Sequence, residues 1–206
     1  MVDLTSVAPG AARVLEFWFG DVDDDGLSPA DLRERWFKQD KAFDDEVHER
    51  FGSTWKRAAR RELDHWNETP LGNVALCIVL DQFPRNMFRG EGAMFSSDGL
   101  GRAVCLNGIN ARRDAELVSD VGVFFYMPLM HSEQRADQHL GMRMFSQLAE
   151  RSPPGAREAM AINLDFMRRH FEIVDRFGRL PHRNQYLDRD STPEEIEFLK
   201  TPGSSF

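Results

Sequence analysis

The chain has 206 residues, a formal net charge of −8 and a mean hydropathy of −0.49, and 41% of its residues are hydrophobic. A chain of this length and composition buries roughly 70% of its unfolded surface on folding, enough for an ordinary globular core. We therefore expect one domain over residues 1–206 and neither disorder nor membrane spanning. The acidic balance argues against nucleic-acid binding, because binding to phosphate backbones needs a basic surface.

The cysteines and the N-terminus point to an intracellular setting. Cys77 and Cys105 lie within apolar segments and form no recognisable disulfide or thiol metal pattern, so we expect both to be buried and unreactive. The N-terminus lacks the charged and apolar regions of a signal peptide, and no apolar run is long enough to span a bilayer. These features predict a cytoplasmic protein with no membrane partner.

Helical periodicity dominates the sequence, whereas the alternation typical of strands is hard to find. We therefore predict an all-α fold of antiparallel helical hairpins joined by short loops. In chain order, the expected helices cover residues 9–19, 28–40, 40–51, 54–66, 71–83, 97–106, 121–126, 132 to the proline pair at 153–154, 156–177, and a last segment that opens at 192.

Particular residues mark the expected helix ends. The predicted N-cap residues are Ser28, Asp40, Ser97 and Ser132. Gly52 is expected to break the third helix and Gly178 to end the helix over 156–177. Pro84 is expected to end or kink the helix over 71–83. Thr192 and Glu195, with proline between them, predict a capping box for the last helix.

The apolar patterns also predict which elements are buried. The helix over 71–83 is apolar on every side through its middle, which is typical of the centre of a bundle. The helix over 156–177 carries two adjoining apolar stripes and should be substantially buried. The four tryptophans are Trp18, Trp36, Trp55 and Trp66. Core packing is the favoured interpretation of their pattern, and service as exposed anchors for a partner is the alternative.

Common catalytic signatures are absent, but ionisable residues gather beside apolar neighbours in three places: residues 80–90, 124–138 and 168–184. In the first, Asp81 lies at the end of the most apolar helix. A carboxylate there needs a partner to offset the loss of water, and Arg85 or a distant arginine can supply it. Asp81 is therefore either a general acid/base or ligand-orienting group, or a structural ion-pair partner at the kink.

In the second place, His131 directly precedes an expected helix, whose dipole favours the neutral imidazole that acts as a base. Glu133 can serve chemistry or simply match the helix dipole. In the third place, His170 falls within an apolar stripe, where a core histidine is the common explanation. Arg176 and Arg183 lie around a helix end, where guanidinium groups can bind a carboxylate or phosphate or cap the helix.

Six segments together resemble one known family. They are VLEFWFG (14–20), RWF (35–37), LDQFPRNMFRG (80–90), FFYMPLMHSE (124–133), RFGRLPHRN (176–184) and DRDSTPEEIEFL (188–199). This ordered set resembles the bacterial family DUF924, and Leu180 and Asp188 depart from the family's usual Phe and Gly. The resemblance implies an all-helical, TPR-like fold and implies no reaction.

The leading hypothesis is that the three places converge on one pocket for a small anionic molecule, with acid/base or hydrolytic chemistry. The candidate catalytic residues are His131, His182, Asp81 and Glu133, and the candidate ligand-binding residues are Arg85, Asn86, His170, Arg176, Arg183 and Asn184. The alternative is a TPR-like scaffold that binds a peptide or protein without catalysis. We expect no cofactor and no metal, since the histidines show no recognised ligand spacing.

Overall fold

The computed structural model describes residues 4–205 and contains helices and no β-strand within that range, which confirms the all-α prediction. The α-helices are α1 (Pro9–Phe19), α2 (Ala30–Phe37), α3 (Lys41–Ala59), α4 (Pro70–Cys77), α5 (Phe83–Met87), α6 (Asp98–Asn110), α7 (Ser119–Met130), α8 (Arg135–Arg151), α9 (Arg157–Phe177) and α10 (Pro193–Leu199). Short 3₁₀ segments are η1 (Asp64–Glu68), η3 (Gly92–Phe95), η4 (Pro154–Ala156) and η5 (Pro181–Tyr186), and η2 (Ile78–Gln82) is a π-helix.

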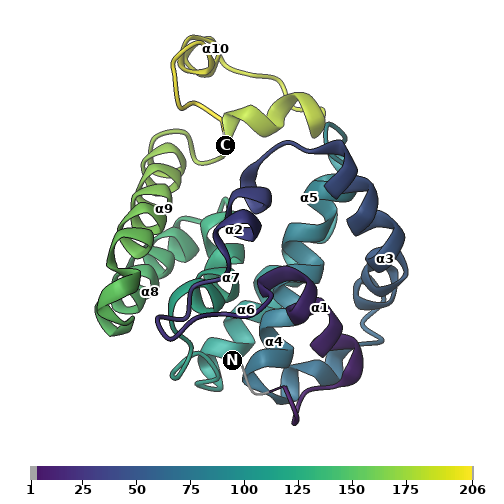
Figure 1. Cartoon of the computed structure of the whole chain (residues 1–206). Helices are drawn as coiled ribbons and strands as arrows, with labels where there is room; N and C mark the ends of the chain where they lie inside the picture. Colours follow the sequence, from purple (N-terminus) through teal and green to yellow (C-terminus); the bar gives the residue numbers. More distant parts are fainter. Residues whose placement is uncertain (1–3, 206) are drawn as a thin grey trace.

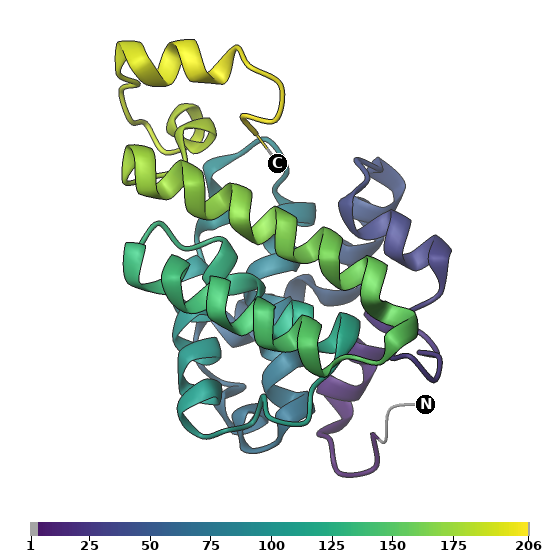
Figure 2. The same ribbon diagram turned by 90° about the vertical axis from the view of Figure 1, so that its left-hand side faces the viewer.

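Helices α4 and α7 form the centre of the molecule. Every residue of α7 is buried, and α4 packs against α1, α6 and α7. Helices α8 and α9 lie side by side and cover α7 from one side (Figures 1 and 2). The segment from η5 to α10 lies at the opposite end of the molecule from the start of α1 (Figure 1).

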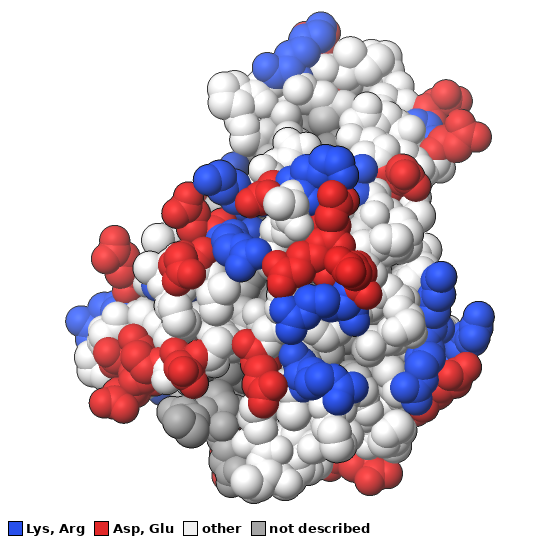
Figure 3. All heavy atoms as spheres, turned by 45° about the vertical axis from the view of Figure 1, so that its right-hand side comes forward, with Lys and Arg blue, Asp and Glu red and all other residues white. Residues whose placement is uncertain are grey.

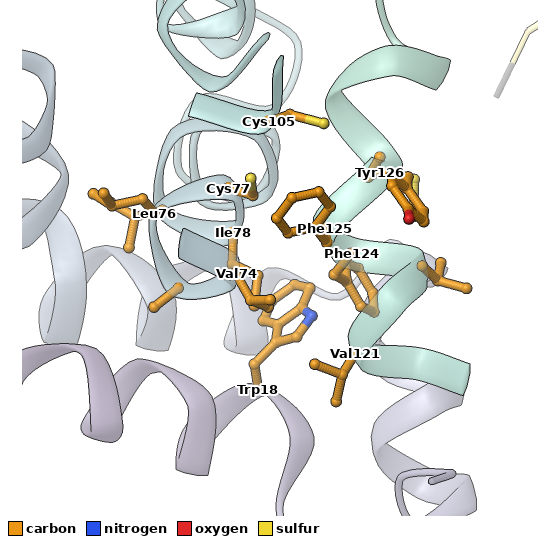
Figure 4. Close-up of a cluster of buried hydrophobic side chains, with 14 of the residues drawn as sticks. Trp18, Val74, Leu76, Cys77, Ile78, Cys105, Val121, Phe124, Phe125 and Tyr126 are labelled. Carbon is orange, nitrogen blue, oxygen red and sulfur yellow. The ribbon is translucent and has the colours of Figure 1, made fainter. Parts of the chain in front are cut away.

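Aromatic residues fill the space between α1 and α7. Trp18 of α1 meets Phe124 of α7 edge to face at 5.3 Å between ring centroids, and Phe124 also contacts Trp36 at 4.6 Å (Figure 4). The thiols of Cys77 and Cys105 lie in the same core and are free and buried, as predicted. Trp18, Trp36 and Trp66 are all buried, so the core-packing interpretation holds for these three, and they do not serve as exposed anchors.

Two predicted breaks are wrong. Helix α3 runs through Gly52, because the stripe of Phe43, Val47 and Phe51 continues to buried Ala58 and packing outweighs the helix cost of glycine, about 1 kcal/mol. The separate helix expected over 54–66 is therefore the end of α3, followed by η1. Helix α7 likewise extends beyond the expected 121–126 and contains Pro128.

The helix ends confirm some predicted caps and correct others. The Asp40 carboxylate accepts hydrogen bonds from the N–H groups of Ala42 and Phe43, and Thr192 with Glu195 forms the predicted capping box. Ser28, Ser97 and Ser132 do not make the predicted N-cap hydrogen bonds. Pro29 and Gln134 occupy the N-cap positions of α2 and α8, and the Ser97 hydroxyl instead donates to the carbonyl oxygen of Leu80 at 2.6 Å.

The junction at Pro84 places Asp81. Helix α4 leads into one π-helical turn, η2, and Pro84 then stands in the first turn of α5, where its missing N–H is no loss. The π-turn absorbs the change of register that proline requires. Asp81 lies in this turn and is only 1% exposed.

Helix α9 is less buried than its two apolar stripes predict. Met160, Met167 and Val174 are buried, but Ile162 is 50% and Phe166 is 39% exposed. No helix within residues 4–205 combines the length and apolar character needed to cross a bilayer.

Candidate functional site

A buried carboxylate and an imidazole form the centre of the candidate site. His131 follows the last residue of α7, and its Nδ1 lies 2.8 and 2.9 Å from the two carboxylate oxygens of Asp81. The amide of Gln82 also donates to Asp81, at 2.6 Å. Because Nδ1 faces a carboxylate, it carries the proton, and Nε2 of the neutral ring keeps its lone pair. This is the arrangement that orients a histidine base.

Two arginines share one further carboxylate beside this pair. Arg85 donates to the backbone carbonyl and the carboxylate of Asp81, and it binds Asp98 with both terminal nitrogens at 2.9 and 3.0 Å. Arg183, on η5, reaches the same Asp98 at 3.2 Å. Both guanidinium groups lie over the ring of Phe95, at 5.7 Å for Arg85 and 4.6 Å for Arg183. Asp98 therefore links α5, α6 and η5.

Two more histidines flank His131. The rings of His131 and His170 are 5.8 Å apart between centroids, and Nδ1 of His170 donates to the carbonyl oxygen of Phe166 at 2.8 Å. His182 precedes Arg183 on η5, and His131, Arg183 and Glu133 all influence its charge. The fold thus brings one histidine from each of three elements to the same place.

Burial and the arginines keep the three histidines neutral. Burial lowers the pKa of His131, and Arg85 lowers it further, while Asp81 acts in the opposite direction. Burial also lowers the pKa of His170 strongly, and burial with the charge of Arg183 lowers the pKa of His182 to about 4. At neutral pH all three rings are therefore uncharged and each has one nitrogen with a lone pair.

The carboxylate of Asp81 stays ionised. Burial opposes ionisation, but Arg85 and the hydrogen bonds from His131 and Gln82 together hold the pKa of Asp81 below its usual value. Arg183 is 5% exposed, and burial together with Arg85 lowers its pKa to about 10, which still leaves it charged at pH 7. Its Nε is buried and has no hydrogen-bond partner among the described residues.

Glu133 holds the segment that carries His182 and Arg183. Its carboxylate accepts the backbone N–H of Leu180 at 2.9 Å and binds both terminal nitrogens of Arg189 at 2.7 and 2.9 Å. Although burial works against ionisation, these hydrogen bonds lower the pKa of Glu133. The predicted catalytic residue Glu133 thus has its carboxylate oxygens occupied, and its contacts are those of a positioning residue.

The remaining candidates lie around this cluster. Asn86 donates to Asp44 at 2.8 Å, beside the ion pair of Arg89 with Asp44. Asn184 donates to Ser191 at 2.9 Å and to Glu195, so it joins η5 to α10. Arg176 pairs with exposed Glu194 at 2.7 Å. The structure therefore brings together Asp81, Arg85, His131, His170, His182 and Arg183, with Glu133 behind them, and places Asn86, Asn184 and Arg176 in other contacts.

Sequence reasoning missed Asp98, Phe95 and Arg189. Asp98 is the first residue of α6, where an acidic residue suits the helix dipole and attracts no attention. A count of charges offers the only signal: Arg85 and Arg183 in apolar surroundings need more than the single carboxylate of Asp81. That count does not say which acidic residue supplies the second one.

Other parts of the structure give no competing site of this kind. A cavity of about 680 Å³ lies beside α1, with Leu15, Phe19 and Leu71 in its wall, and one of about 160 Å³ lies between α2 and α9. Neither is lined by the candidate residues. Within residues 4–205, no group of three His, Cys, Asp or Glu side chains is arranged to hold a metal ion.

Charges elsewhere on the surface are paired. On the face shown in Figure 3, Lys and Arg side chains are interleaved with Asp and Glu. Exposed pairs such as Arg168 with Asp165, and Arg50 with Glu46, follow helical spacing and are ordinary surface contacts. The cluster around His131 differs because its ionised groups are largely buried.

Comparison with known proteins places the chain in a family. The solved structure of the protein of unknown function ATU0120 from Agrobacterium tumefaciens is 37% identical, with a TM-score of 0.78 over 92% of this chain and 96% of that one. A search of curated proteins gave no match. The profile of the bacterial proteins of unknown function DUF924 matches residues 14–203. As its motifs predicted, the chain belongs to the DUF924 family.

Proposed function

We propose that this chain binds a small anionic molecule at the cluster around His131 and acts on it by acid/base chemistry. The observation that carries the proposal is the pairing of a base with an anion-binding group. His131 is oriented by Asp81, and the buried guanidinium of Arg183 has an Nε with no partner among the described residues.

The base has the properties that acid/base catalysis needs. Asp81 fixes the ring and leaves Nε2 with a lone pair, and His131 is 15% exposed at its side chain, so solvent and small solutes reach it. In the neutral state Nε2 can take a proton from water or from a substrate. The resulting imidazolium is stabilised by the carboxylate of Asp81, as in hydrolases that activate a nucleophile.

The anion would be held by Arg183. One terminal nitrogen of Arg183 is used by Asp98, which already binds Arg85 in a two-point contact, so the claim of Asp98 on Arg183 is weak. The planar guanidinium can present its remaining edge to a carboxylate or phosphate. Phe95 supports the guanidinium from one face, which keeps it in place.

Calorimetric titration with sodium acetate and with inorganic phosphate at pH 6.5 tests the binding step. The variant R183Q should weaken binding of the preferred anion at least about tenfold, because a charged hydrogen bond contributes about 1.5–3 kcal/mol. R183K keeps the charge and should fall between the two. R168Q, which changes an exposed arginine, should bind like the unmodified chain. Equal affinity in R183Q and the unmodified chain would refute the proposal.

The catalytic step is tested with a chromogenic aryl ester that carries a carboxylate. If His131 is the base, H131Q should lower its hydrolysis rate about 100-fold or more, the usual contribution of general base catalysis. H65Q, which changes an exposed histidine on η1, is the matched control. A rate that depends on neither residue would leave the site with binding alone and remove the acid/base role.

A further inference from the structure

The charges of the candidate site balance one another completely. The charged and titratable groups around His131 are Asp81 on η2, Arg85 on α5, Asp98 on α6, Glu133 after α7, His170 on α9, His182 and Arg183 on η5, and Arg189, which pairs with Glu133. Three guanidinium groups face three carboxylates, and the three histidines are neutral. A bound anion therefore adds a charge that nothing in the cluster offsets.

Adding one uncompensated charge to a largely buried cluster is costly. The cost is removed if a proton arrives with the anion. Of the three histidines, His131 is best placed to take that proton, because its Nδ1–H already points at the carboxylate of Asp81 and protonation at Nε2 completes an ion pair. His170 donates Nδ1–H to a neutral carbonyl oxygen and gains no such pair.

Resting on the function proposed above, we propose that the ligand is a monoanion of the carboxylate class and that it binds together with one proton, which His131 takes up at Nε2. The proton comes from solvent and the anion's charge is offset by the new imidazolium, so the site's net charge is unchanged. A phosphate dianion brings twice the charge and would need a second proton, which the buried His170 is poorly placed to accept.

The proposal also assigns the direction of pH dependence. A ligand that binds with one proton binds more weakly as pH rises above the pKa of free His131, by about tenfold per pH unit. Burial and Arg85 set that pKa below 6.5, so the whole range from pH 6.5 upwards should show this slope. Acetate itself stays ionised throughout this range and adds no slope of its own.

Calorimetry in buffers of different ionisation enthalpy counts the protons directly. With acetate at pH 7.5, we expect uptake of close to one proton per bound anion, and a dissociation constant about tenfold larger than at pH 6.5. Phosphate should bind more weakly than acetate. H131Q should bind acetate with no proton uptake and little pH dependence, whereas H65Q should behave like the unmodified chain.

The outcomes separate this inference from the function on which it rests. If acetate binds through Arg183 but without proton uptake, or if H131Q retains the uptake, proton-linked binding is wrong and the anion site stands. Tighter binding of phosphate than of acetate overturns the assignment to monocarboxylates. If neither anion binds at any pH, both this inference and the proposed function fail.

Discussion

Asp81 is the residue on which the charge balance of the site depends. Its carboxylate meets His131, Arg85 and Gln82 while being almost fully buried. Buried ion pairs are not a general source of stability, but removal of one partner leaves the other charge without compensation. Asp81 therefore couples the stability of the fold to the function of the site.

We predict that D81N lowers the free energy of unfolding by about 3–5 kcal/mol, since Arg85 loses one of its two carboxylates within a buried cluster. Urea denaturation measures the change. D165N, which removes a half-exposed partner of Arg168, should cost less than about 1 kcal/mol. Equal losses in the two variants would show that Asp81 behaves as ordinary surface charge.

The neutral histidines give a second prediction. The pKa values of His131, His170 and His182 are lowered in the folded chain, so below about pH 6.5 the unfolded chain binds protons that the folded chain does not. Stability should be level above pH 7 and fall as pH drops from 6.5 towards about 4, by up to about 1.4 kcal/mol per pH unit for each histidine.

Urea midpoints at pH 7.5, 6 and 5 check this slope. H170Q replaces the most buried of the three rings by an amide that can still donate to Phe166, and it should show a shallower fall than the unmodified chain. A midpoint that does not change between pH 7.5 and pH 5 would contradict the assignment of neutral, buried histidines.

At the scale of elements, one segment decides whether the site is assembled. Residues 179–190 carry His182 and Arg183 and are tied to the rest of the chain by Glu133, by Asp98 and by the two-point contact of Arg179 with Glu195. Helices α5, α6 and α7 supply the other side chains. Loss of any one tie should loosen this segment while the helical core stays folded.

We predict that E133Q increases amide hydrogen exchange of residues 180–187 at least about tenfold, because the ion pair with Arg189 becomes a weaker neutral contact. Exchange in α4 and α7 should not change. E172Q, which alters an exposed i to i+4 partner of Arg168 on α9, is the control. Faster exchange throughout the chain in E133Q would instead indicate a global loss of stability.

Two glycines test the account of helix ends. Gly178 ends α9 with a positive φ of 71° and Gly99 lies in the first turn of α6, and an added Cβ at either meets open space. Hence G178A should destabilise by about 1 kcal/mol through backbone strain alone, whereas G99A should stabilise slightly, by up to about 1 kcal/mol. Thermal denaturation distinguishes them, and a gain of stability in G178A would refute the left-handed end of α9.

At the scale of the whole molecule, the sequence predicts the fold class and several helix ends correctly. Periodicity gives α1 at both ends, the cap at Asp40 and the capping box at Thr192. These are local features, in which a few neighbouring residues settle the outcome. The break expected at Gly52 fails because packing of the buried stripe of α3 against the rest of the core outweighs a local propensity.

The same distinction applies to the site. The sequence singles out Asp81, His131, His170 and the arginines, since ionisable groups beside apolar neighbours need partners. It does not show that Asp98 links Arg85 with Arg183, or that Glu133 holds Leu180 and Arg189, because those contacts join residues 47 to 85 positions apart. Only the tertiary packing of α6, α7 and η5 brings these residues together.

The central claim is that His131 is a neutral base that becomes charged when an anion binds, and nitrogen chemical shifts of isotope-labelled histidine measure its state directly. At pH 7.5 without ligand, we expect the Nδ1–H tautomer of a neutral ring. Saturation with acetate should convert this ring, and not that of His170, to an imidazolium. A His131 ring that is charged before acetate is added, or one that stays neutral at saturation, would contradict the account.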